Sequence, residues 1–340
     1  MSDAVHDAAL RDVEGRHDDA VALLRHASDG ADVAATRVLG KRLTVGRNAP
    51  FASLEGVSLL TAAMDLGDAE ATAVMAALTG AGAWTTQSWP RALDLLQLAA
   101  ERGSDDARVQ LALLAPPGMA ATTDWKRLRD AVRLESWIVP PVPRQVSEAP
   151  RVWTVENFAS AELCAWLIGR ARGRTTRAKV FDGKTVSVDG KRSNSSFGVD
   201  VIEAGIVGQL LRFRIMGATT LSVTHMEPPH ILYYAQGEEF APHYDALYIN
   251  APASEDSDRQ VTFLLYLNDG YDGGELAFVR TGFRHKGAVG DGVFFTNMVG
   301  GKPDPLSEHA GLPVTSGEKW LLSQWIRDRP VGASASASTR

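Results

Sequence analysis

The sequence predicts a chain of two structural parts, an N-terminal array of α-helical repeats and a C-terminal all-β sandwich or jelly roll with flanking helices. Three observations predict this division. An internal repeat runs through the first 115 residues, short β-branched and aromatic runs follow one another from His230 onward, and a proline-containing stretch separates the two patterns. A length of 340 residues is sufficient for two domains.

The first part carries a repeat with a constant step of 36 residues. The same step relates three leucine pairs, Leu23-Leu24, Leu59-Leu60 and Leu95-Leu96. It also relates Asp32, Asp68 and Ser104, which are expected to cap the second helix of each unit. A period of this size predicts stacked helical hairpins, and the pattern resembles the Sel-one-like branch of tetratricopeptide-related repeats. A coincidental alanine-rich helical bundle is the alternative.

Two positions depart from the repeat. Ala31 stands where the other units have Gly67 and Gly103, at the turn between the paired helices. The segment from Thr79 to Pro90 is expected to be a longer loop than its counterparts.

Residues 116–150 are predicted to be a connector, because Pro116-Pro117-Gly118 and Pro140-Pro141-Val142-Pro143 flank one expected helix, Thr123 to Leu134. Proline at this density makes a linker semi-rigid. Residues 331–340 alternate alanine and serine, cannot form a packed element, and are expected to be disordered. The predicted domains are therefore 1–115 and 151–330, with the connector between them.

Residues 151–330 change from helical to strand-like periodicity. Arg151 to Val155 is expected to be a strand, and Ser160 is expected to cap a helix that runs through Leu163 and Leu167. The later strands are bounded by Gly, Pro, Asn or Asp and are predicted at His230–Tyr234, Val261–Leu267, Gly274–Val279, Gly292–Thr296 and Lys319–Ile326. Their even spacing predicts a sandwich or jelly roll in which Thr262 to Leu267 is a central buried strand.

One group of residues predicts chemistry. His243-Tyr244-Asp245 is followed by His309 sixty-six residues later. Two imidazoles and one carboxylate can hold Fe(II) on one face of an octahedron and leave the other positions open, although zinc, cobalt and manganese accept the same donors. If Pro242 to Leu247 is an extended strand, His243 and Asp245 point from one face, because side chains alternate with period two.

A longer pattern surrounds these residues: Tyr234-x-x-Gly237-x-x-Phe240-x-x-His243-x-Asp245, then Tyr266-Leu267-Asn268 and Gly273-Gly274-Glu275, then His309-Ala310-Gly311 and Gly317-Glu318-Lys319-Trp320. The pattern resembles the 2-oxoglutarate and Fe(II)-dependent oxygenases of the prolyl 4-hydroxylase type, over residues 151–329. The resemblance implies a double-stranded β-helix, which is a jelly roll.

The resemblance also implies roles for individual residues. His243, Asp245 and His309 match the iron ligands, and Lys319 matches the cation that pairs with the distal carboxylate of 2-oxoglutarate. Tyr266 matches a tyrosine that hydrogen-bonds the same carboxylate, and Tyr234 matches a tyrosine that lines the cosubstrate pocket. An ordinary solvated lysine is the alternative for Lys319, but an unpaired lysine buried in an apolar strand is costly.

Arg259 matches a position at which relatives present an arginine to a bound peptide, so it is a candidate substrate-binding residue. Arg327 is the next candidate for the cosubstrate cation after Lys319. The polar segment from Lys184 to Phe197 falls where relatives have a mobile loop that closes over a peptide. Together with the basic run that begins at Arg170, it is either a substrate rim or a solvated helix end.

The cofactors implied are Fe(II), 2-oxoglutarate as cosubstrate and dioxygen, with ascorbate as an accessory reductant. In such enzymes the oxidative decarboxylation of 2-oxoglutarate to succinate and carbon dioxide drives hydroxylation of a second substrate. Relatives that halogenate replace the carboxylate two residues after the first histidine with a small residue. Asp245 occupies that position here, which favours hydroxylation.

Composition excludes several other classes. A net charge of −6 provides no basic footprint for nucleic acid, and no nucleic-acid partner is expected. The first 19 residues are polar and acidic, unlike a signal peptide, and no apolar run approaches the length of a membrane span. We therefore predict a cytoplasmic protein without a membrane partner. The single cysteine, Cys164, is expected to be a small buried hydrophobe.

The predicted function is hydroxylation of a residue, a prolyl residue first, in a peptide or protein that the helical repeats recruit. Hydroxylation of a free amino acid or small natural product is the first alternative. A repeat-based adaptor with a vestigial oxygenase core is the second, and the presence of all four of His243, Asp245, His309 and Lys319 disfavours it.

Overall fold

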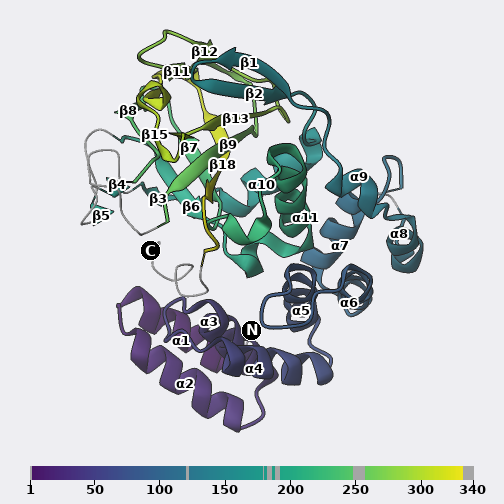
Figure 1. Ribbon diagram of the computed structural model, residues 1–340. Coiled ribbons are helices and arrows are strands. Elements are labelled where there is room, and N and C mark those ends of the chain that lie inside the picture. The colour runs from purple at the N-terminus through teal and green to yellow at the C-terminus, as the bar shows by residue number, and fades with distance from the viewer. Residues whose placement is uncertain are drawn as a thin grey trace. The chain divides into compact units, whose positions relative to one another are not determined.

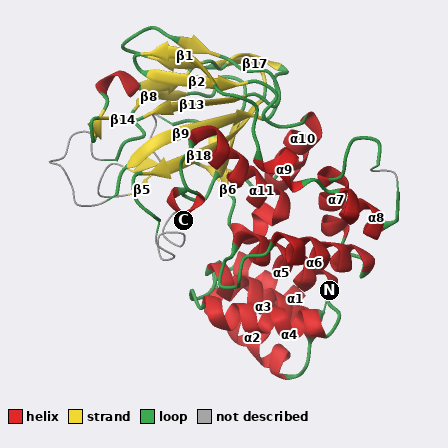
Figure 2. Ribbon diagram, turned by 45° about the vertical axis from the view of Figure 1, so that its right-hand side comes forward, coloured by secondary structure: helices red, strands yellow, loops and turns green. Residues whose placement is uncertain are grey.

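A computed structural model describes residues 2–119, 122–178, 180–181, 186–187, 192–247 and 257–331. The chain divides into two compact units. The helical unit comprises the residues up to Trp137 together with Asp200–Leu211, and the β unit comprises Ile138–Val199 and the residues from Arg212 onward. Figure 2 shows the strands in yellow within the β unit and the first helices in red within the helical unit.

The helices of the first unit follow one another along the chain, and each helix from α1 to α7 contacts the next one (Figure 1). They are α1 Asp3–Val13, α2 His17–Asp29, α3 Val33–Val45, α4 Ser53–Asp65, α5 Ala69–Ala81, α6 Trp89–Glu101, α7 Asp105–Leu114, α8 Trp125–Ala131 and α9 Leu134–Ile138. The second leucine of each predicted pair is fully buried, at Leu24, Leu60 and Leu96. The 36-residue repeat therefore recurs in the burial of side chains as well as in residue type.

The predicted helix caps of the repeat are confirmed. The side chains of Asp32, Asp68 and Ser104 accept hydrogen bonds from backbone amides three residues later, at 3.0, 2.7 and 3.2 Å. The predicted long loop from Thr79 to Pro90 is wrong at both ends, because α5 continues to Ala81 and α6 begins at Trp89. Alanine and threonine are compatible with a last helical turn that the loop interpretation overlooked.

The unit boundary differs from the predicted one. It falls at Trp137, later than residue 115, and the predicted connector contains α8, α9 and a strand. Asp200–Leu211 belongs to the helical unit, where Arg47 contacts Glu203 at 2.8 Å and the backbone amide of Ile206 donates to Gln110 at 2.8 Å. These are contacts between residues far apart in sequence, which local patterns do not encode.

The β unit contains one eight-stranded and one four-stranded sheet, and every recorded pairing between its strands is antiparallel. The larger sheet has the order β1 Arg144–Glu148, β2 Arg151–Val155, β13 Gly292–Thr296, β9 Arg259–Tyr266, β18 Lys319–Arg327, β7 His230–Tyr234, β6 Ser195–Gly198 and β3 Thr176–Arg177. The smaller sheet has the order β12 Arg284–His285, β11 Leu276–Phe278, β16 His309–Gly311 and β8 Phe240–His243. This architecture confirms the predicted jelly roll.

Short pairs complete the strands: β10 Tyr271–Gly273 with β17 Val314–Gly317, β14 Met298–Val299 with β15 Lys302–Pro303, and β4 Val180–Phe181 with β5 Val186–Ser187. The remaining helices are α10 Ala161–Ala171, α11 Val201–Thr219 and two 3₁₀ turns, η1 Val223–His225 and η2 Pro305–Ser307. Ser160 caps α10 as predicted, since its hydroxyl accepts from the amide of Leu163 at 3.2 Å. Cys164 on this helix is buried, and burial raises its thiol pKa to about 12, which suits a packing role.

Side chains of both sheets form one apolar core. Its members include Leu264 and Tyr266 of β9, Leu321 of β18 and Phe278 of β11. The last six residues of β9 are buried, so the predicted central strand is confirmed. One predicted strand is wrong: β8 ends at His243, and Asp245 lies in the bend beyond it.

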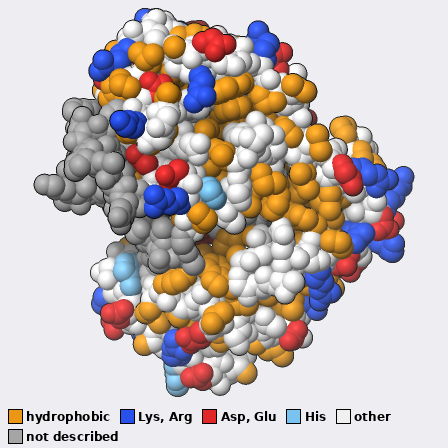
Figure 3. Space-filling model, in the orientation of Figure 1, with side chains coloured by type: hydrophobic (Ala, Val, Ile, Leu, Met, Phe, Trp, Pro, Cys, Tyr) orange, Lys and Arg blue, Asp and Glu red, His pale blue; other side chains and the backbone are white. Residues whose placement is uncertain are grey.

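Within the described residues, no helix combines the length and apolar character that spanning a membrane requires. On the face drawn in Figure 3, acidic and basic side chains are interspersed. The tail predicted to be disordered lies, from residue 332, outside the described residues, and so do residues 184–185 and 188–191 of the predicted substrate rim.

The turn positions of the repeat generate a stability prediction. Ala31, Gly67 and Gly103 have φ values of 66°, 90° and 104°. An L-residue costs about 1–2 kcal/mol in this left-handed region, part of which a stiffer unfolded chain offsets. Nothing lies within 4 Å of a Cβ built at Gly67. Gly67→Ala should therefore lower the free energy of unfolding by roughly 1 kcal/mol, and Ala31→Gly should raise it by a similar amount, in urea unfolding followed by circular dichroism.

Gly169→Ala is the matched control, because Gly169 lies inside α10, has open space at its Cβ position and has no positive φ. There the same substitution should stabilise the protein by about 1 kcal/mol. Equal stability of Gly67→Ala and the wild type would contradict the strain argument.

Candidate metal centre

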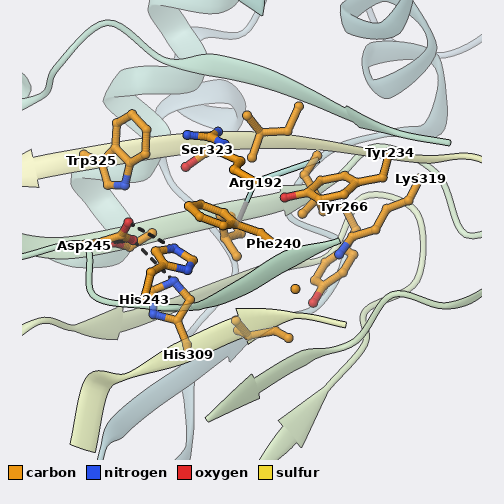
Figure 4. A pocket seen from close by; sticks show the side chains of 16 residues that line it. Arg192, Tyr234, Phe240, His243, Asp245, Tyr266, His309, Lys319, Ser323 and Trp325 are labelled. Atoms are coloured by element: carbon orange, nitrogen blue, oxygen red, sulfur yellow. Dashed lines mark hydrogen bonds and ion pairs between the residues drawn. The ribbon is translucent and has the colours of Figure 1, made fainter. Parts of the chain in front are cut away.

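Strand pairing brings the two predicted histidine ligands together. His243 ends β8, His309 begins β16, and the two residues are directly paired across these antiparallel strands. Their ring centroids are 4.3 Å apart. Asp245 reaches the same point from the bend after β8, with Oδ1 3.7 Å from His243 Nε2 and Oδ2 3.6 Å from His309 Nε2 (Figure 4). The three donor groups predicted from sequence therefore form one cluster, with their donor atoms within 4.8 Å of one another.

Backbone carbonyls fix the tautomers of both histidines. His243 Nδ1 lies 2.9 Å from the carbonyl oxygen of Ala241, and His309 Nδ1 lies 2.9 Å from that of Ser307. Since a carbonyl oxygen only accepts, each Nδ1 carries the proton and each Nε2 presents a lone pair toward Asp245. This arrangement orients metal-binding imidazoles in proteins.

Ionisation also suits a metal. Burial, assisted by His309, lowers the pKa of His243 to about 3, which keeps its ring neutral. Burial opposes ionisation of Asp245, but the positive charge of the neighbouring histidines when protonated, that of Arg259 and a hydrogen bond from Thr262 outweigh it and lower the pKa of this carboxyl group. Metal ligands must be deprotonated, and two neutral imidazoles with one carboxylate fit the donor set of Fe(II).

A cavity enclosing about 480 Å³, part of it continuous with solvent, adjoins the cluster. Its wall follows the period of two of the larger sheet. Alternate side chains of three neighbouring strands line it: Leu232 and Tyr234 of β7, Thr262, Leu264 and Tyr266 of β9, and Lys319, Leu321, Ser323 and Trp325 of β18. Figure 4 shows the metal cluster on one side of this cavity and Lys319 with the two tyrosines on the other.

Lys319 is buried, with only 2% of its surface exposed. Its Nζ donates to the carbonyl oxygen of Gly274 at 2.5 Å and lies 5.0 Å from the ring centroid of Tyr234. Burial lowers the ammonium pKa to about 7, although Glu275 acts in the opposite direction. A Cβ at Gly274, where φ is 67°, would stand 3.1 Å from Lys319 Cδ, so glycine is needed beside this side chain.

Both predicted tyrosines line the same cavity. Burial raises the pKa of Tyr234 to about 12 and raises that of Tyr266 further. Both hydroxyls therefore keep their protons and can donate to an anion. The hydroxyl of Tyr266 lies 3.4 Å from the carbonyl oxygen of His285, a long contact that a better acceptor would replace.

Arg259, predicted to bind substrate, does not line the described cavity. Its guanidinium makes two hydrogen bonds of 2.9 Å to the carboxylate of Glu227 and lies 3.8 Å from the ring centroid of Trp325. Arg327 shares the same carboxylate at 2.8 Å and does not line the cavity either. Glu227 thus engages both cations, and Arg259 supports the cavity wall through Trp325.

Sequence reasoning missed several residues of the site. Arg192 lines the cavity, with its Nε 2.9 Å from Asn194 Oδ1 and its guanidinium 4.6 Å from the ring centroid of Phe240. Phe240 stacks on His243 with 3.5 Å between centroids. For Thr262 and Trp325 a signal existed, because period two from Tyr266 and Lys319 places both on the cavity face. Arg192 was included only within the predicted rim segment.

Comparison with known proteins gives concordant matches. The profile of the 2OG-Fe(II) oxygenase superfamily matches residues 229–327. The chain is 32% identical over 210 residues to probable prolyl 4-hydroxylase 9 of Arabidopsis thaliana, a match that covers 55% of this chain and 73% of that protein. It is 30% identical over 204 residues to prolyl 4-hydroxylase 1 of the same plant, covering 55% and 72%.

Two solved structures are similar to part of the chain at low sequence identity. The viral collagen prolyl hydroxylase of Paramecium Bursaria Chlorella virus-1 in complex with 2OG is 24% identical and covers 52% of this chain and 95% of its own, with a TM-score of 0.42. A Sel1 repeat protein from Oxalobacter formigenes is 22% identical and covers 40% and 55%, with a TM-score of 0.31.

Proposed function

We propose that this chain, which belongs to the 2OG-Fe(II) oxygenase superfamily and has prolyl 4-hydroxylases as relatives, is a hydroxylase. Its proposed substrate is a prolyl residue of a peptide or protein. Family membership makes it a 2-oxoglutarate-dependent dioxygenase that uses Fe(II). The observation that supports an active enzyme is the coexistence, around one cavity, of a complete two-histidine, one-carboxylate cluster and a buried lysine.

In this proposal the chain's own residues bind and orient. His243, Asp245 and His309 hold iron through the two Nε2 atoms and a carboxylate oxygen. Lys319 pairs with the distal carboxylate of 2-oxoglutarate, and the hydroxyl of Tyr266 donates to it. When bound, iron and 2-oxoglutarate would activate dioxygen, of which one oxygen atom would enter succinate as carbon dioxide is lost and the other would enter the substrate. Leu232, Leu264, Leu276 and Leu321 give the cavity an apolar lining.

The side of the cavity away from Lys319 suits a prolyl peptide. Trp325, which lines the cavity, offers an aromatic surface against which an apolar pyrrolidine ring can pack. Arg192 offers a donor for a peptide carbonyl beside it. The names of the Arabidopsis relatives support the same substrate class.

Removing one histidine tests the function. Protein loaded anaerobically with Fe(II) and then given 2-oxoglutarate, oxygen and proline-rich peptides should produce succinate, and a peptide should gain one oxygen atom by mass spectrometry. His309→Ala should abolish both products, because the iron loses a ligand. His225→Ala, whose ring contacts the carbonyl of Arg327 outside the cavity lining, is the matched control and should retain both.

Equal succinate production by wild type and His309→Ala would overturn the assignment. Oxygen incorporated into free amino acids or small metabolites, with none in peptides or proteins, would replace the prolyl-peptide substrate with a small molecule while leaving the enzyme class intact.

Lys319→Met separates binding from stability. Pairing a buried ammonium with a carboxylate is worth about 2–5 kcal/mol when one partner is truncated, so 2-oxoglutarate affinity should fall by at least about thirtyfold while iron affinity is retained. Calorimetric titration measures both affinities. Unchanged 2-oxoglutarate affinity would move the anchor to another cation, and Arg192 is the next one in the cavity lining.

Without cosubstrate, Lys319→Met should also change how the free energy of unfolding depends on pH. The folded-state pKa of Lys319 is depressed to about 7 from 10.5 in its reference state, so the unfolded chain binds more protons between these values. The free energy of unfolding of the wild type should therefore gain a contribution that rises from pH 7 toward pH 10 and is absent below pH 7. Lys319→Met should lack this rise and be the more stable protein at pH 6. A parallel pH dependence in both proteins would contradict it.

We further propose that the helical repeats recruit the substrate. Stacked helical hairpins present extended surfaces that suit peptides. Leu54 of α4 is 75% exposed, and Phe51 just before it is 40% exposed with its ring edge-on to Trp84 at 6.0 Å. Deleting the repeats is an unsuitable test, because Ile206 and its neighbours belong to the helical unit and would lose their partners.

A double substitution, Phe51→Glu with Leu54→Glu, tests recruitment instead. It should raise KM for a protein substrate about tenfold or more, because it places charge on an apolar binding surface. KM and kcat for a short peptide should stay unchanged, which serves as the internal control for the cavity. Undiminished efficiency on the protein substrate would assign the repeats, at this surface, a role other than recruitment.

A further inference from the structure

We propose that Thr262 and Asn297 are positioning residues for the metal centre: Thr262 holds the Asp245 carboxylate, and Asn297 joins that carboxylate to the loop that orients His309. The inference rests on the proposed use of His243, Asp245 and His309 as metal ligands. Neither Thr262 nor Asn297 belongs to the ligand set itself.

A short chain of hydrogen bonds runs behind Asp245. The hydroxyl of Thr262, on β9, lies 2.6 Å from Asp245 Oδ2. The amide nitrogen of Asn297, between β13 and β14, lies 2.9 Å from the same hydroxyl. Asp245, Thr262 and Asn297 are 6%, 1% and 0% exposed, so water does not compete for these bonds. The chain crosses from the larger sheet to the bend that follows the smaller one.

Chemistry fixes the direction of every bond in this chain. A carboxylate that holds a metal is deprotonated and can only accept. The Thr262 hydroxyl must therefore donate its one proton to Asp245, which leaves its oxygen free to accept. Only the amide nitrogen of Asn297, and not the amide oxygen, can then face it. A donor of the same shape is required at position 297, and a carboxylate there would compete with Asp245 for the hydroxyl proton.

The consequence for Asp245 is an inequality between its two oxygens. Oδ2 accepts from Thr262, whereas no hydrogen bond to Oδ1 is recorded in the described parts of the chain. Oδ1 is the oxygen nearer to His243 Nε2, at 3.7 Å, and Oδ2 is the oxygen nearer to His309 Nε2, at 3.6 Å. Thr262 thereby holds the carboxylate in the orientation that places its two oxygens beside the two imidazole Nε2 atoms.

The main chain of Asn297 reaches the other ligand. Its carbonyl accepts from the amide of Asp304 at 2.8 Å, and the carbonyl of Asp304 accepts from the amide and hydroxyl of Ser307 at 3.0 and 2.7 Å. The carbonyl of Ser307 in turn holds His309 Nδ1. The amide of Asn297 donates to Gln260 of β9 at 2.8 Å, which fastens this junction to the larger sheet. One residue thus connects the supports of two ligands.

Stability alone does not account for asparagine here. Its amide oxygen is buried and has no hydrogen-bond partner among the described residues. A buried acceptor without a partner is destabilising, and an apolar side chain of similar size would avoid that cost. Among the described residues, the Asn297 side chain makes one recorded hydrogen bond, from its amide nitrogen to Thr262.

The test compares metal affinities of paired variants. Thr262→Val removes the hydroxyl at constant shape and should weaken Co(II) or Fe(II) binding by about 10–100-fold, in anaerobic titrations without 2-oxoglutarate. Thr262→Ser keeps the hydroxyl and should restore affinity to within about threefold. Thr154→Val is the matched control, because Thr154 is also buried in the larger sheet but its hydroxyl has no recorded partner. It should leave metal affinity unchanged.

Asn297→Asp gives a second measurement that preserves size. It should weaken metal binding and alter the visible absorption of the Co(II) protein, since the carboxylate geometry around the metal changes. The Thr262→Val and Asn297→Asp effects should be less than additive in the double variant, because Asn297 acts on Asp245 through Thr262. This variant decides the question if Thr262→Val does not fold.

Wild-type metal affinity and Co(II) spectrum in folded Thr262→Val or Asn297→Asp would overturn the inference, even if the unfolding midpoint falls. That outcome is separate from failure of the proposed function. If the wild type itself binds no metal and makes no succinate, the proposed function fails first.

Discussion

The cross-strand pairing of His243 with His309 is the contact on which the whole site depends. In an antiparallel pair, a slip of one residue would turn every side chain to the opposite face. The register between β8 and β16 shifts between His309 and Gly311, so that Phe240 pairs with Gly311 and stacks on His243. Asp245, the two carbonyl-held imidazoles and the cavity wall all take their positions from this register.

Period two accounts for most of what the sequence predicted. The strands β2 and β13 match their predicted bounds, and the faces of β9 and β18 that line the cavity follow from Tyr266 and Lys319. Apart from the loop at Thr79, the errors share one physical cause, which is partners distant in sequence. Glu227 engages Arg259, Gln110 holds the backbone at Ile206, and Asp245 leaves the strand to reach Thr262 of another sheet. No local pattern specifies such partners.

The buried polar groups of the site destabilise the β unit. A lysine and an asparagine are fully enclosed, and several buried polar atoms of the described residues lack partners. An apolar core drawn from both sheets offsets these costs, because Leu264, Tyr266 and Leu321 belong both to the core and to the cavity wall. The same side chains therefore stabilise the jelly roll and give the cavity an apolar lining. Such a lining strengthens electrostatic interactions within the cavity.

The carbonyl of Gly274 gives Lys319 a partner before any cosubstrate arrives. In the proposed binding mode, the ammonium would exchange this carbonyl for a carboxylate oxygen when a dicarboxylate enters, and the exchange would reverse when the product leaves. The Lys319 ammonium therefore keeps a hydrogen-bond partner between turnovers. Exchange of product for cosubstrate at this end then changes only the hydrogen-bond acceptor of Lys319. The pocket therefore need not rearrange between turnovers.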